Sequence, residues 1–129
     1  SASPLYPFGY GLSYTSFDYS DLHLSAVTPR SFEVSFKVRN TGKYDGEEVA
    51  QLYLRDEYAS VVQPLKQLKH FARFYLKHGE ERVVKFILSE EDFSLVDRNL
   101  KRIVEPGTFQ IMIGAASNDI RLQTKVEIK

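Results

Sequence analysis

The chain has 129 residues and a mass of 14.8 kDa, which suits one domain with its own buried core. It is 43% hydrophobic and 26% charged, so its composition is that of a folded domain and not of a disordered segment. The 17 basic residues balance the 17 acidic ones, which argues against a nucleic-acid partner. The absence of cysteine excludes disulfides, thiolate zinc sites and thiol nucleophiles, and no apolar run reaches the roughly 18 residues of a membrane-spanning helix.

Residues 1–16 form an aromatic leader, and residues 17–129 are predicted to be the domain proper. The chain begins without an initiator methionine or a signal-peptide pattern, so it is interpreted as part of a longer protein. Prolines and glycines interrupt the leader and prevent a regular helix or a central strand. The leader either folds back on the sheet of this domain or lies at an interface with a partner domain. The interface candidates within it are Tyr6, Phe8, Tyr10, Leu12 and Tyr14.

From Phe17 onward, apolar and polar residues alternate with the period of two that is typical of half-buried antiparallel strands. The clearest case is the stretch in which Phe32, Val34, Phe36 and Val38 alternate with polar residues. The other predicted strands are 19–27, 48–56, 81–88, 108–114 and 121–128. Residues 65–76 are compatible with a short helix or a strand, and the strand is favoured because the neighbouring elements are all β.

Turn residues separate these predicted strands. Asn40-Thr41-Gly42 ends one strand, Gly79 is interpreted as closing a hairpin, and Asn118-Asp119 is interpreted as another turn. Ser89 followed by three acidic residues indicates the start of a helical turn that crosses between sheets. About seven short strands with turns between them predict an all-β fold, a sandwich of antiparallel strands.

No group of side chains in this sequence predicts chemistry. Paired acidic residues such as Glu47-Glu48 and Glu90-Glu91 are explained by solvated turns and by the end of a helical turn. His23, His70 and His78 lack the spacing of metal ligands, and no serine lies in a nucleophile elbow. We therefore predict no catalytic residue, no cofactor and no metal site.

The basic residues and the tyrosines of the sequence are relevant to ligand binding. The basic residues Lys66, Lys69, His70, Arg73 and Lys77 are interpreted as a solvated face in preference to an anion site. Sugar-binding modules present exposed aromatic rings, tryptophan above all, and the chain has no tryptophan. The tyrosines that could substitute for it are Tyr44, Tyr53, Tyr58 and Tyr75, although their spacing does not mark a platform.

Several motifs together resemble the C-terminal domain of glycoside hydrolase family 3 enzymes, which are β-glucosidases, β-xylosidases and their relatives. The matching segments are 4–15, 38–42, 46–54, 64–71 and 105–109, so the resemblance runs from Pro4 to the C-terminus. The chain departs from the family at His70, where glycine is more common, and at His78-Gly79, where Pro-Gly is more common. Both departures are expected to lie in one hairpin.

The resemblance implies a fibronectin type III or immunoglobulin-like β-sandwich. It also implies that the aspartate nucleophile and the general acid/base of a retaining glycoside hydrolase lie in other domains, so this chain alone is not an enzyme. The first functional hypothesis is an accessory domain that packs on the catalytic domains of the same polypeptide, with Val61 and Val62 as further interface candidates. The alternative is a carbohydrate-binding module that holds the enzyme on an oligo- or polysaccharide. The resemblance implies a periplasmic or extracellular location.

Overall fold

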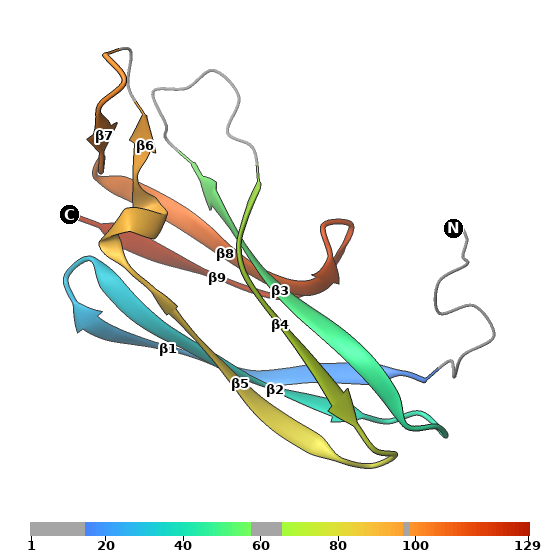
Figure 1. Cartoon of the computed structure of the whole chain (residues 1–129). Coiled ribbons are helices and arrows are strands. Elements are labelled where there is room, and N and C mark those ends of the chain that lie inside the picture. The colour runs from blue at the N-terminus through green and yellow to red at the C-terminus, as the bar shows by residue number, and fades with distance from the viewer. Residues whose placement is uncertain (1–14, 58–65, 97–98) are drawn as a thin grey trace.

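The computed structural model describes residues 15–57, 66–96 and 99–129, which form strands and one short helical turn (Figure 1). The long strands are β1 (Phe17–Thr28), β2 (Ser31–Asn40), β3 (Gly46–Asp56), β4 (Gln67–Leu76), β5 (Glu81–Leu88), β8 (Gly107–Ala116) and β9 (Asp119–Ile128). The short elements are the 3₁₀ turn η1 (Glu90–Phe93) and the two-residue strands β6 (Leu95–Val96) and β7 (Arg102–Ile103). The described residues contain no helix long and apolar enough to cross a membrane.

The seven long strands make two antiparallel sheets that pack face to face. One sheet has the strand order β1-β2-β5, and the other has the order β4-β3-β8-β9. The small ribbon of β6 and β7 projects from one end of the sandwich (Figure 1). The predicted sandwich of about seven antiparallel strands is therefore confirmed. The strand assigned to the ambiguous residues 65–76 is confirmed over Gln67–Leu76, and Leu65 lies outside the described residues.

The core lies between the two sheets because alternate residues of each strand point inward. Val34, Phe36 and Val38 of β2 are all buried, as their alternation predicts. The opposite sheet contributes Ala50, Leu52 and Leu54 from β3, together with inward residues of the other strands. Burial of these side chains supplies the main favourable contribution to folding, at about 25 cal/mol per Å² of apolar surface.

Two local predictions were wrong. The turn at residues 77–80 is not a hairpin, because β4 pairs with β3 whereas β5 pairs with β2 in the other sheet. Gly79 has a φ of 81°, a conformation that favours glycine and lets the chain change sheets within four residues. His70 consequently lies within β4 and not in a turn.

The turn η1 closes one end of the core. The Asp92 carboxylate accepts a hydrogen bond from the Ser89 backbone N–H at 2.9 Å, which holds the first turn as the sequence predicted. Phe93 then points into the core, where its ring packs edge-on against Phe32 of one sheet and Phe109 of the other, at centroid distances of 5.9 and 5.0 Å. The chain crosses from β5 to β8 through this turn, so we name this the crossover end.

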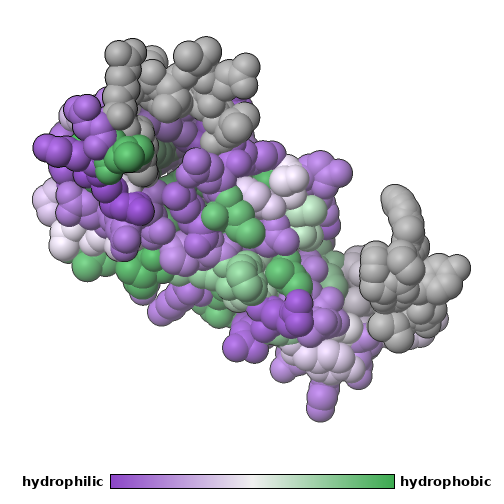
Figure 2. All heavy atoms as spheres, turned by 45° about the horizontal axis from the view of Figure 1, so that its top comes forward, coloured by the Kyte–Doolittle hydropathy of each residue, from purple (hydrophilic) through white to green (hydrophobic). Residues whose placement is uncertain are grey.

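The opposite end receives the leader, and we name it the leader end. It holds residues 15–16, the loop between β2 and β3, and the turn between β4 and β5. The 11 residues of β3 run from the leader end to the crossover end, a span of about 33 Å at the usual rise per residue. Figure 2 shows that one face of the molecule is mostly hydrophilic, with separate hydrophobic side chains set among the charges.

Candidate interdomain junction

The buried side chain of Asn40 organises the leader end. It is the one fully buried polar residue among the described residues of the core, at 0% exposure. Its Nδ2 group donates to the carbonyl oxygens of Tyr44 and Leu76 at 2.8 and 3.0 Å. Its Oδ1 atom accepts from the Gly42 N–H at 3.0 Å and from the Thr15 hydroxyl at 2.5 Å. Asn40 therefore connects the last residues of the leader, the β2–β3 loop and the end of β4.

The two residues after Asn40 hold the incoming chain against the sandwich. The Thr41 N–H donates to the Ser16 carbonyl at 2.8 Å. Gly42 lies so close to this segment that an added Cβ would stand 2.1 Å from the Thr15 hydroxyl and 2.5 Å from the Ser16 nitrogen. Only glycine leaves room for the chain at this position. The Asn40-Thr41-Gly42 motif thus fixes where the leader joins the domain.

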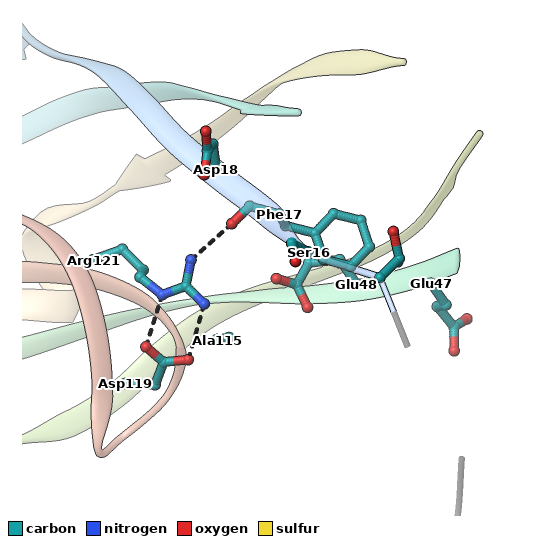
Figure 3. A pocket seen from close by; sticks show the side chains of 9 residues that line it. Ser16, Phe17, Asp18, Glu47, Glu48, Ala115, Asp119 and Arg121 are labelled. Atoms are coloured by element: carbon teal, nitrogen blue, oxygen red, sulfur yellow. Dashed lines mark hydrogen bonds and ion pairs between the residues drawn. The ribbon is translucent and has the colours of Figure 1, made fainter. Parts of the chain in front are cut away.

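A charged cluster lies beside this attachment, at the open side between β1 and β9 (Figure 3). The Arg121 guanidinium donates to the Phe17 carbonyl at 2.8 Å and forms a two-point ion pair with Asp119 at 2.7 and 3.2 Å. The same guanidinium lies over the Tyr19 ring, 5.4 Å from its centroid. The Tyr19 hydroxyl in turn donates to the Glu48 carboxylate at 2.9 Å. These contacts join β1 to β3 and β9 across the sandwich.

Partial burial shifts the acid–base behaviour of the cluster. Burial, reinforced by the negative charge of Glu48, raises the pKa of Tyr19. Burial also raises the pKa of Glu48, although the hydrogen bond from Tyr19 opposes that rise. The hydrogen bond from Arg121 lowers the pKa of Asp119. At neutral pH the Tyr19 hydroxyl is therefore a stable hydrogen-bond donor.

An open pocket of about 570 Å³ lies beside the cluster. It is lined by Thr15, Ser16, Phe17, Asp18, Glu47, Glu48, Ala115, Asp119 and Arg121. Figure 3 shows that the Arg121 guanidinium points toward Phe17 and Asp119, with which its nitrogens form hydrogen bonds. Retaining glycosidases need one carboxylate as a nucleophile and a second as an acid, about 5–5.5 Å apart. Glu48 instead bonds Tyr19 and the Val49 N–H, which assigns it a structural role.

The remaining candidates for chemistry are also structural. His70 bonds the Asp92 carboxylate at 3.0 Å and stacks on Phe86 at 5.7 Å, so it joins β4 to the crossover between the sheets. His78 bonds the Gly42 carbonyl at the leader end. Within residues 15–57, 66–96 and 99–129, no three histidine, aspartate or glutamate side chains gather as a metal site would require.

The predicted interface residues Tyr6, Phe8, Tyr10, Leu12, Tyr14, Val61 and Val62 all lie outside the described residues, so their role stays a prediction. The boundary at residue 17 also stays a prediction. The structure adds Asn40, Gly42 and Arg121, which the sequence analysis did not select. The sequence marked the motif Asn40-Thr41-Gly42 as a turn and as part of the family resemblance, but not as the attachment of the leader, and nothing in the sequence marked Arg121.

The tyrosines that could substitute for tryptophan differ in exposure. Tyr53 is buried, and the Lys66 ammonium lies 5.8 Å from the centre of its ring. Tyr58 lies outside the described residues. Tyr44 and Tyr75 are exposed, at 56% and 59%, and both lie toward the leader end. The face that Tyr53 was expected to supply is therefore covered within the domain.

The strand order and the buried core define this chain as a β-sandwich of the fibronectin type III kind. Residues 48–117, more than half of the chain, match the model of the family described as the fibronectin type III-like domain, and the chain belongs to that family. The match includes β3, the strand that carries Glu48 and spans the two ends of the sandwich.

The relatives that contain this domain are longer proteins. The chain is 47% identical to a beta-xylosidase of Formosa agariphila and 44% identical to a periplasmic beta-glucosidase of Salmonella typhimurium, over 95% and 92% of its length. It superposes on the GH3 beta-glucosidase of Bifidobacterium adolescentis with a TM-score of 0.85 at 31% identity, over 95% of its length. It spans only 16–18% of these proteins. The predicted resemblance to the C-terminal region of glycoside hydrolase family 3 enzymes is confirmed.

Proposed function

We propose that this chain is a non-catalytic accessory domain of a glycoside hydrolase that cleaves β-linked glycosides. It packs against the catalytic domains of the same polypeptide and stabilises them. The observation that carries the proposal is the attachment of Thr15 and Ser16, which are hydrogen-bonded to Asn40 and Thr41 and closely packed against Gly42. Because residues 15 and 16 are held against the sandwich, the orientation of the sandwich relative to the preceding part of the polypeptide is restricted.

The comparisons support the same proposal. The relatives are named beta-xylosidase and beta-glucosidase, and more than four-fifths of each lies outside the matched segment. The periplasmic relative supports a periplasmic or extracellular location for the polypeptide.

The test is made in the full-length polypeptide that carries this chain. One variant ends before residue 17, and a second carries Phe8→Ala with Tyr14→Ala. We expect both to lower the melting temperature of the catalytic region, with hydrolysis of an aryl β-glucoside or β-xyloside at low temperature largely retained. Equal melting temperatures with and without residues 17–129 would refute the stabilising role.

The alternative, a carbohydrate-binding module, predicts a different result. The 129-residue chain would migrate more slowly in a native gel that contains soluble β-glucan or xylan than in a gel without polysaccharide. We expect equal migration relative to a non-binding reference protein in both gels. Retardation by one polysaccharide would favour the binding module.

A further inference from the structure

The outward side of β4 carries an unusual number of exposed apolar side chains. Leu68, Phe71 and Tyr75 are 48%, 64% and 59% exposed. Their partners on β3 are Tyr53, Gln51 and Glu47, so all three lie on the face of the sheet that points away from the core. Arg73 lies between the two aromatic residues on the same face. We name Leu68, Phe71, Arg73 and Tyr75 the β4 strip.

Among the described residues, no other strand presents three exposed large apolar side chains on one face. On the outward side of the other sheet, Val83 and Ile87 are exposed, but Lys85 separates them, and Lys37 and Glu33 lie opposite them on β2. Single apolar residues among charges are normal on a protein surface, whereas three large apolar side chains on one strand face, two of them aromatic and interrupted by Arg73 alone, form a patch of the kind that marks an interaction surface.

The domain already covers the neighbouring part of the same face. Lys66 crosses to the β8–β9 turn, where its ammonium donates to the Ser117 carbonyl and lies over the buried Tyr53 ring. Met112, opposite Tyr53 on β8, is also buried. The side chains along β4 remain exposed beside this covered region.

The β4 strip begins at the leader attachment. Asn40 bonds the carbonyl of Leu76, the residue after Tyr75, and also bonds the Tyr44 carbonyl. The exposed ring of Tyr44 therefore belongs to the same corner of the molecule. From Tyr75 to Leu68 the strip extends about 23 Å along the strand toward the crossover end. A body joined to the leader at this corner would have the strip directly beside it.

We propose that the β4 strip is the surface on which the catalytic part of the same polypeptide packs. This inference rests on the proposed function and assigns its contact surface. Aromatic residues and arginine are the residue types enriched at protein interfaces. The partner surface that fits is apolar with polar groups at one position, because Arg73 lies within the strip with the Glu47 carboxylate 3.9 Å from its Nε atom.

A protein partner fits the strip better than a sugar chain does. A sugar ring stacks on an aromatic face, and only Phe71 and Tyr75 offer rings on this strand. Leu68 and the neighbouring Val49, which pairs with Arg73, gain free energy mainly by burial against other apolar groups. The aliphatic members therefore favour a packed interface.

Because the chain has no cysteine of its own, an introduced thiol can report burial of the strip. The test variant is Phe71→Cys, and the matched control is Val83→Cys on the edge strand of the other sheet, where the wild-type side chain is similarly exposed. Alkylation is followed by peptide mass spectrometry in the 129-residue chain and in the full-length polypeptide. Circular dichroism checks that both variants are folded.

We expect the two thiols to react at similar rates in the 129-residue chain. In the full-length polypeptide, the thiol at position 71 should react at least tenfold more slowly, and the thiol at position 83 should be unaffected. Equal rates at the two positions in the full-length polypeptide would overturn the proposal. Protection of position 71 in the 129-residue chain only after addition of β-glucan or xylan, or only at high protein concentration, would overturn it in favour of sugar binding or self-association.

The two proposals fail in different ways. Where removal of residues 17–129 destabilises the catalytic region but position 71 reacts as fast as position 83, the accessory role stands and the β4 strip is the wrong surface. Where removal has no effect on stability but position 71 is protected, the surface is right and the stabilising role is wrong.

Discussion

The two ends of the sandwich are closed by opposite means. At the crossover end, the ring of Phe93 fills the space between Phe32 and Phe109, and contacts among apolar rings close the core. At the leader end, Asn40 closes the core with four hydrogen bonds to backbone and side-chain groups. Both side chains are at most 1% exposed, so the difference lies in chemistry and not in burial.

The two kinds of contact restrict the geometry of the two ends to different degrees. Apolar contacts are non-directional, so the crossover end depends on volume and shape. Hydrogen bonds have fixed distances and angles, and a buried polar group left without a partner is costly. The leader end can therefore hold one entering chain in one geometry, which suits a junction.

The largest effect is expected at Phe93. Phe93→Ala should lower the free energy of unfolding by about 3–5 kcal/mol, because it leaves a cavity between the sheets. Phe93→Leu should cost much less, since it keeps most of the apolar volume. Urea unfolding of the 129-residue chain measures both. Losses of the same size for leucine and alanine would show that the crossover end is not governed by volume.

Substitution of Asn40 should cost less in total but should act locally on the leader. Asn40→Ala leaves the Tyr44 and Leu76 carbonyls and the Gly42 N–H without their partner, at a cost of about 2–3 kcal/mol. Hydrogen exchange at the Thr41 N–H, which bonds Ser16, should accelerate beyond the change that global destabilisation explains.

The control for Asn40 is Phe93→Ala under the same conditions. It should raise exchange at Thr41 only as far as the lower global stability requires. Asn40→Asp offers a second comparison, because it keeps the acceptor but replaces the donor toward Leu76 with an oxygen. If Asn40→Asp were as stable as the wild type, the donor role of the side chain would be refuted.

The smallest effect is expected at Glu48 and depends on pH. Burial raises its pKa above 4.5, so the folded state binds this proton more tightly than the unfolded state does. The contribution of Glu48 to stability should therefore grow as the pH falls from neutral toward 4.5. Glu48→Gln should remove that dependence and add less than about 1 kcal/mol at neutral pH, since the group is half-buried and screened by solvent.

Asp119 provides a contrast of opposite sign within the same cluster. Its lowered pKa means that its contribution is present above 3.8 and is lost as the pH falls through the folded value. Unfolding midpoints in urea at several pH values, measured for Glu48→Gln and Asp119→Asn, separate the two. Identical pH profiles for the two variants would contradict the environments described for these carboxylates.

Most of the sandwich could be predicted from the period of two, because each strand has one buried face. The predicted strand at residues 81–88 matches β5, and the inward residues of β2 are those that alternation selects. Pairing across sheets could not be predicted in this way. The turn at Gly79 has the composition of a hairpin. The chain nevertheless enters the other sheet after this turn, because β5 pairs with β2.

The junction was harder to predict because it depends on residues distant in sequence. Asn40 and Gly42 were recognised as a turn, but their contacts with Thr15 lie 25 or more residues away. Arg121 acts on the Phe17 carbonyl across 104 residues. No local pattern encodes such a contact, whereas the aromatic leader was conspicuous in the sequence itself.

Arg73 also affects the tendency of the chain to aggregate while β4 is exposed to solvent. β4 is an edge strand, and residues 71–76 read Phe-Ala-Arg-Phe-Tyr-Leu, a composition suited to pairing with the edge of another chain. A single guanidinium in the middle of this run must be desolvated before two such edges can stack. Arg73 therefore acts as a gatekeeper against aggregation wherever the β4 edge is exposed, in addition to its place in the proposed packing surface.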